Sequence, residues 1–99
     1  MVLSDRFQQQ LIFNLNKYLK TTADLLKIGD VALVTHFDID KIPFKLLEMG
    51  CLPGNEIRVL QIAPFGDPIY FDVNNGSHLA IRKETARDIE VEILNNKVD

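Results

Sequence analysis

Glycine and proline interrupt the middle of this chain so often that it cannot form a long helix or a long strand there. The stretch from Lys45 to Phe71 reads KLLEMGCLPGNEIRVLQIAPFGDPIYF and contains three glycines and three prolines. Its longest run without either residue is 55–63. Both residues are disfavoured inside helices and strands. The sequence therefore predicts a small fold of short elements that are joined by tight turns.

The runs between these turns are rich in β-branched and aromatic residues, which favours strands. We expect five strands, at residues 31–37, 56–63, 69–73, 78–82 and 88–94. In the second of them the alternation slips near Leu60, which indicates a β-bulge or a strand that is buried on both faces. Asn75-Gly76 predicts a tight hairpin turn that would place His78 opposite Val73. Together these features predict a mainly β chain that forms a small, strongly bent barrel.

Two short helical segments are expected between the strands. Asp40 is a candidate N-cap for a helix over Lys41–Met49, with Pro43 in its first turn. Gly50 can end this helix because glycine adopts the left-handed conformation without a steric cost. Residues 83–87, KETAR, predict a single helical turn before the last strand.

Apolar residues at helical spacing predict a helix from Ser4 to Lys20, ahead of the barrel. Its apolar stripe consists of Phe7, Leu11, Leu15 and Tyr18. We favour packing of this stripe on the barrel. The alternatives are a contact between two copies of the chain and, least favoured, a membrane surface. The expected organisation is an N-terminal helical extension at 1–21, a barrel at 22–94 and a frayed tail at 95–99.

Length, charge and cysteine content exclude several classes of protein. A chain of 99 residues with a formal net charge of −3 predicts one domain and argues against nucleic acid as the main partner. Cys51 is the only cysteine, so neither an internal disulfide nor a cysteine-rich zinc site can form. We find no signal peptide or membrane-spanning run, which makes the cytoplasm the expected location. The sequence also has no P-loop, dinucleotide fingerprint or triad motif.

Three residues before the inserted helix could in principle bind a metal ion. His36, Asp38 and Asp40 alternate in an extended segment, so their side chains would share one face. Imidazole and carboxylate suit ferrous iron, but the spacing is weak evidence, and we favour a solvated strand end. For His78 we favour a cross-strand neighbour, and for Cys51 a small core residue, over metal or redox roles. We therefore assign no metal site, with Fe²⁺ or another transition metal as the alternative.

The segments LLEMGCLPGNEIRVLQIAPFGDPIYFDV and HLAIRKETARDIEV closely resemble the FeoA family of ferrous iron transport accessory proteins. The resemblance rests on a helix ending in Leu-x-x-Met-Gly, a Pro-Gly turn, the motif Ala-Pro-x-Gly-Asp-Pro and a Leu-Ala-Ile-Arg strand. These motifs occupy residues 46–50, 53–54, 63–68 and 79–82. The resemblance extends from Thr22 to Ile93.

This resemblance implies an SH3-like barrel without enzymatic activity and a cytoplasmic role beside FeoB, the membrane GTP-binding ferrous iron transporter. We expect the partner surface to include Lys45, Glu48, Met49, Cys51, Pro64 and Phe65. Phe65 either projects as an exposed anchor or lies buried at the mouth of the barrel. A second copy of the chain, bound through the N-terminal helix, is a further expected partner. The alternative functions are a transition-metal sensor that acts on a partner protein and a generic SH3-like module for peptide or RNA.

Overall fold

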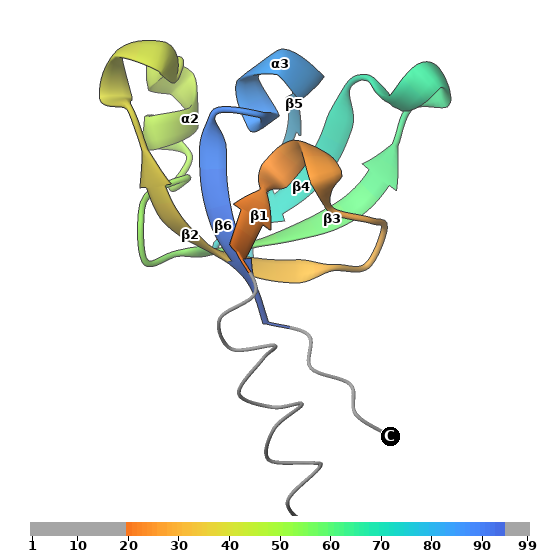
Figure 1. Ribbon diagram of the computed structural model, residues 1–99, viewed down its shortest axis with the longest axis horizontal. Helices are drawn as coiled ribbons and strands as arrows, with labels where there is room; N and C mark the ends of the chain where they lie inside the picture. Colours follow the sequence, from red (N-terminus) through yellow and green to blue (C-terminus); the bar gives the residue numbers. More distant parts are fainter. Residues whose placement is uncertain (1–19, 95–99) are drawn as a thin grey trace, which may run out of the picture.

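The computed structural model describes residues 20–94, and these form one antiparallel sheet that curves into a small barrel (Figure 1). The order of the strands is β1-β6-β2-β3-β4-β5. Their bounds are β1 Lys20–Thr22, β2 Val31–Phe37, β3 Glu56–Ile62, β4 Ile69–Val73, β5 Ser77–Ile81 and β6 Ile89–Ile93. The helices α2 Phe44–Glu48 and α3 Lys83–Ala86 are short, as are the 3₁₀ turns η1 Ala23–Leu25, η2 Ile39–Lys41 and η3 Pro64–Gly66. Among residues 20–94, no helix is long and apolar enough to cross a membrane.

The core lies between the curved halves of the sheet. Alternate side chains of the longer strands point into it: Ala32, Val34, Ile57, Val59, Phe71, Val73, Ile89 and Val91. Leu46 of α2 and Ala86 of α3 pack in the same cluster, so both helices are attached to the barrel by buried contacts. Each fully buried large aliphatic or aromatic side chain contributes about 1.5–3 kcal/mol. Period-two burial therefore accounts for the strands that the sequence predicts.

Two β-bulges bend the sheet. One shifts the register of β3 against β4 between Val59 and Gln61. Leu60 is 39% exposed, so of the two explanations for the slip near this residue the β-bulge fits and burial on both faces does not. The other shifts β2 against β6 between Val34 and His36. A bulge adds one unpaired residue and increases the local twist, which lets a short sheet curve strongly.

The first strand was not predicted. Lys20 pairs with Glu92 and Thr22 with Glu90, so the end of the expected N-terminal helix, Lys20, is in β1 instead. The remaining residues of that helix, with its apolar stripe, and the expected tail at 95–99 lie outside the described residues. Three residues are too few to show alternation, so this strand cannot be recognised from the sequence. Within residues 20–94 the sheet has six strands, one more than expected.

The inserted helix is shorter than the helix predicted at 41–49, and its cap differs. Ile42 has extended angles, φ −104° and ψ 126°, because the ring of Pro43 disfavours the helical region for the preceding residue. The helix therefore begins after the proline. The expected N-cap, Asp40, is not one: the carboxylate of Asp38 accepts a hydrogen bond from the Asp40 N–H at 3.0 Å and caps η2.

The hairpin between β4 and β5 turns in three residues, 74–76, rather than in a two-residue Asn-Gly turn. Both asparagines of this loop have positive φ angles, 53° and 55°, a conformation that asparagine tolerates better than most residues. The pairing therefore shifts by one residue from the expected one. His78 lies opposite Asp72, and not opposite Val73.

Candidate partner-binding rim

The short helices gather at one end of the barrel. Figure 1 shows α2, α3 and η3 at the same end, with α3 between the other two. We call α2, η2, η3 and α3 together the helical rim. Within residues 20–94 the rim carries three of the most exposed large apolar side chains, Ile39, Phe44 and Phe65. Large apolar side chains that remain in solvent add nothing to the core, which makes the rim a candidate contact surface.

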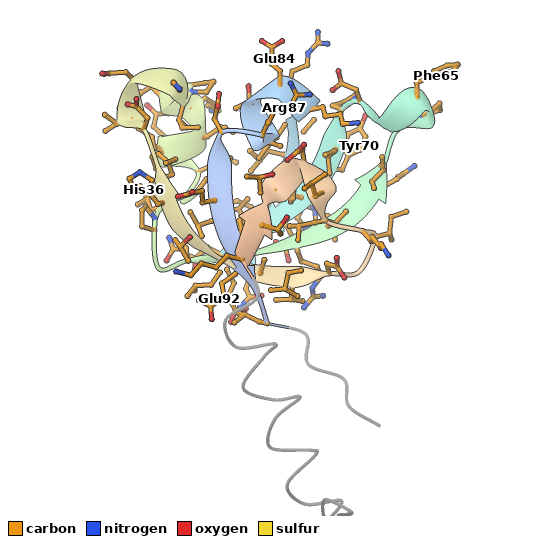
Figure 2. The ribbon with its side chains drawn as sticks, in the orientation of Figure 1. His36, Phe65, Tyr70, Glu84, Arg87 and Glu92 are labelled. Carbon is orange, nitrogen blue, oxygen red and sulfur yellow. The ribbon has the colours of Figure 1, made fainter. Side chains whose placement is uncertain are left out.

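Phe65 is fully exposed at the tip of η3, with a relative accessibility of 105%. Figure 2 shows its ring directed away from the barrel. The structure therefore decides between the two positions expected from the sequence in favour of the exposed one. The φ angle of Phe65 is 67°, in the left-handed region that non-glycine residues rarely occupy. The backbone of Phe65 is therefore strained, and its aromatic ring is exposed to solvent.

The loop that carries Phe65 is held at several points. The N–H of Gly66 donates to the carbonyl oxygen of Ala63 at 2.9 Å. The N–H of Ala63 in turn donates to the carbonyl oxygen of Pro68 at 3.0 Å. Asp67 connects the loop to α3, because its Oδ1 accepts from the Lys83 N–H at 3.0 Å. The Asp67–Pro68 peptide bond is cis. The hydrogen bonds of Ala63, Gly66 and Asp67 fix η3 relative to the rest of the rim.

On α2, the predicted partner residues fall into two groups. Lys45 and Glu48 are exposed, and Met49 is half-buried. Cys51 has no exposed surface, and its N–H donates to the Leu46 carbonyl oxygen at 2.9 Å. It lies in the core beneath α2, so its thiol has no direct access to a partner. Burial raises the pKa of the Cys51 thiol to about 11, so the folded chain disfavours the thiolate, which is the nucleophilic and metal-binding form.

The structure does not bring the six predicted residues into one compact cluster. Pro64 and Phe65 lie on η3, and the α2 residues lie on the other side of α3 (Figure 1). Two exposed apolar residues of the rim were not predicted, namely Phe44, which is 70% exposed, and Ile39, which is 64% exposed. A helix of five residues offers no periodicity from which an outward-facing apolar residue could have been recognised.

The residues weighed as metal ligands do not form a site. Among residues 20–94, no group of three or more His, Cys, Asp or Glu side chains could hold a metal ion. His36 is exposed and borders a surface hollow of about 420 Å³, lined also by Thr22, Thr35 and Glu90. His78 Nε2 lies 3.8 Å from Asp72 Oδ1, which agrees with the favoured cross-strand role.

A six-stranded, strongly bent antiparallel barrel with a rim of short helices defines a small β-barrel module of the SH3 type. The model of the FeoA domain family matches residues 21–93. The chain belongs to this family, which is linked to ferrous iron transport.

Three similar proteins place the chain within this family. A Fe(2+) transport protein A/Fe(2+) transporter FeoB fusion protein of Porphyromonas gingivalis is 35% identical over 72 residues, which are 72% of this chain and 8% of the fusion protein. The structure of a FeoA-like protein from Clostridium acetobutylicum is 33% identical, with a TM-score of 0.67, over 76% of this chain and 87% of that one. Stenotrophomonas maltophilia FeoA complexed with zinc, described as a prokaryotic SH3 domain protein, is 28% identical, with a TM-score of 0.59, over 72% and 88%.

Proposed function

We propose that this chain is a non-enzymatic accessory module of ferrous iron uptake. It acts in the cytoplasm by binding the cytoplasmic part of a FeoB-type iron transporter through the helical rim. The partner is suggested by the fusion protein, in which a segment similar to this chain is joined to FeoB. Fusion of two proteins in one chain is expected where the two act side by side.

The observation that carries the proposed binding surface is Phe65. A left-handed backbone costs a non-glycine residue about 1–2 kcal/mol, and a fully exposed ring recovers none of that through burial. The stability of the isolated barrel therefore does not explain a phenylalanine here. Aromatic side chains, phenylalanine included, are however enriched at protein interfaces relative to the rest of the surface. Strain of this kind is found where a conformation serves a function.

The attachment of the loop supports the same proposal. Association orders mobile loops and side chains, and this ordering lowers the affinity. Because Asp67 fixes η3 to α3, little additional ordering of the backbone is needed when Phe65 enters a pocket on a partner. The rim therefore offers an anchor that is already placed for binding.

Titration calorimetry of the full chain against the cytoplasmic domain of the cognate transporter tests this proposal. We expect saturable binding that Phe65→Ala weakens about tenfold or more, as for other aromatic anchors. Ile28→Ala is the matched control, since Ile28 is also exposed, at 63%, but lies between η1 and β2, outside the rim. Equal loss of affinity in both variants would contradict the rim as the binding surface, and absence of binding by the wild-type chain would contradict the function.

A further inference from the structure

A groove runs between α2 and the junction of β5 with α3. Its floor is apolar and consists of Pro43, Leu46, Ala80 and Ile81. Because these residues come from two segments far apart in the chain, the groove is built by the fold and not by one loop. Leu46 and Ile81 belong to the core, which fixes both segments that form the floor. We call this feature the α2–β5 groove.

The size of the α2–β5 groove favours a peptide side chain over a free small molecule. Its volume is about 210 Å³. Pockets for small-molecule ligands usually enclose about 300–1,000 Å³. A space of this size accommodates one or two apolar side chains of a longer segment that continues on the surface outside.

The charges at the α2–β5 groove are positive. Lys45 and Arg82 line it, and no carboxylate does. Lys45 makes no ion pair with any residue of 20–94, although Glu48 lies one turn further on α2. Arg82 Nη1 is 3.9 Å from Asp67 Oδ2, but both side chains are exposed, and such long surface pairs contribute little. Both cations can therefore pair with carboxylates of a partner, even though the whole chain has a net charge of −3.

The strand that forms one wall adds a second element of recognition. β5 is the last strand of the sheet, with β4 as its only strand neighbour among the described residues. An edge strand presents backbone N–H and C=O groups on its free side, to which an extended segment can add as a further strand. An extended peptide along β5 would bring alternate side chains to the groove that Ala80 and Ile81 line.

We propose that the α2–β5 groove binds an extended, acidic segment of the partner protein, with an apolar side chain on the groove floor and carboxylates beside Lys45 and Arg82. This inference rests on the proposed function, and it specifies the chemistry of the transporter segment that is bound. It adds a second contact to the one made by Phe65, on the other side of α3.

Charge reversal tests the inference. The full chain is titrated with the cytoplasmic domain of the cognate transporter, at low and at high salt. We expect Lys45→Glu and Arg82→Glu each to weaken binding about tenfold or more, and the affinity of both variants to depend less on salt than that of the wild type. Arg58→Glu is the control, since Arg58 is an exposed cation on β3, outside the rim, and it should change affinity less than about twofold.

The outcomes separate the two proposals. Wild-type affinity in both groove variants would overturn the acidic-segment inference and leave the proposed function intact, because the transporter domain would still bind. No binding by the wild-type chain would overturn both. Since Arg82→Glu places a second acid beside Asp67, thermal unfolding of each variant is measured as well. If Arg82→Glu unfolds early, Lys45→Gln and Arg82→Gln replace the reversals, and loss of affinity in these folded variants supports the groove.

Discussion

Gly50 follows α2 with a φ angle of +97°, and this one angle determines which residues the position accepts. We expect Gly50→Val to destabilise the protein by about 1–3 kcal/mol, because a β-branched residue is strained in this region. Crowding adds little, since a Cβ at this position would lie 3.6 Å from its nearest neighbour, the Cβ of Asn74. Urea denaturation followed by circular dichroism measures the loss.

A second glycine provides the control for this substitution. Gly76 does not have a positive φ angle, and a Cβ at this position would meet nothing within 4 Å. Gly76→Ala is therefore expected to leave the denaturation midpoint unchanged or slightly raised. If Gly50→Val shifted the denaturation midpoint no more than Gly76→Ala does, backbone strain would not explain why glycine occupies position 50.

The buried Cys51 thiol makes the free energy of unfolding depend on pH in the alkaline range. Burial raises the pKa of its thiol from 9.0 to about 11 in the folded chain, so the folded state disfavours the thiolate. The stabilisation is complete below pH 9, where both states are protonated, and it is lost as pH rises to about 11, because the unfolded chain deprotonates first. We expect the free energy of unfolding to fall more steeply over this range than in Cys51→Ala.

Comparison with Cys51→Ala isolates the contribution of the thiol, because every other ionisable group is present in both proteins. Urea denaturation at several pH values gives the two profiles. Parallel profiles would show that the thiol is solvated in the folded state.

At the scale of elements, strands were predicted better than helices. The strands at 31–37 and 69–73 have the expected bounds, and β3 ends one residue earlier than expected. Their alternation reflects burial, which the sequence records directly. The prediction of a helix at 41–49 relied on local capping and turn residues alone, and in the structure Pro43 delays the start of the helix to Phe44. The shift at His78 came from loop length, which an Asn-Asn-Gly sequence does not determine.

The two faces of β4 give an element-level prediction. Phe71 is fully buried and Tyr70 is 40% exposed, so adjacent residues of one strand lie in opposite environments. We expect Phe71→Ala to cost about 3–5 kcal/mol through lost burial and a cavity. Tyr70→Ala should cost much less, because much of its ring remains in solvent. Urea denaturation of both variants checks this, and similar losses would contradict the assignment of the faces.

At the scale of the whole molecule, the family and the barrel could be predicted from sequence, whereas the geometry of the rim could not. Turn residues and motif order were sufficient for the family. The position of α3 between α2 and η3 depends on how the sheet curves, and a linear sequence does not show this (Figure 1). The burial of Cys51 depends on Leu46 and the strands around it. The exposure of Phe65 depends on a positive φ angle that the sequence does not signal.

The whole chain is expected to lack a tight site for ferrous iron. Its potential ligands are sparse, and those within residues 20–94 do not cluster. Anaerobic titration calorimetry with Fe²⁺ should therefore show no saturable one-to-one binding at low-micromolar or tighter dissociation constants. Such binding would favour the metal-sensor alternative over an accessory module that acts through protein contacts alone.

The two ends of the described barrel lie next to each other, and this affects how strongly the rim must bind. Lys20 pairs with Glu92 across β1 and β6, and Figure 2 shows Glu92 at the opposite end of the barrel from Phe65 and Glu84. A tether at either end would therefore leave the rim free to face its target. A short flexible tether gives an effective concentration in the millimolar range, at which even contacts of modest affinity are largely occupied. A module of this geometry, when joined covalently to its target, could bind and release rapidly without being lost by diffusion.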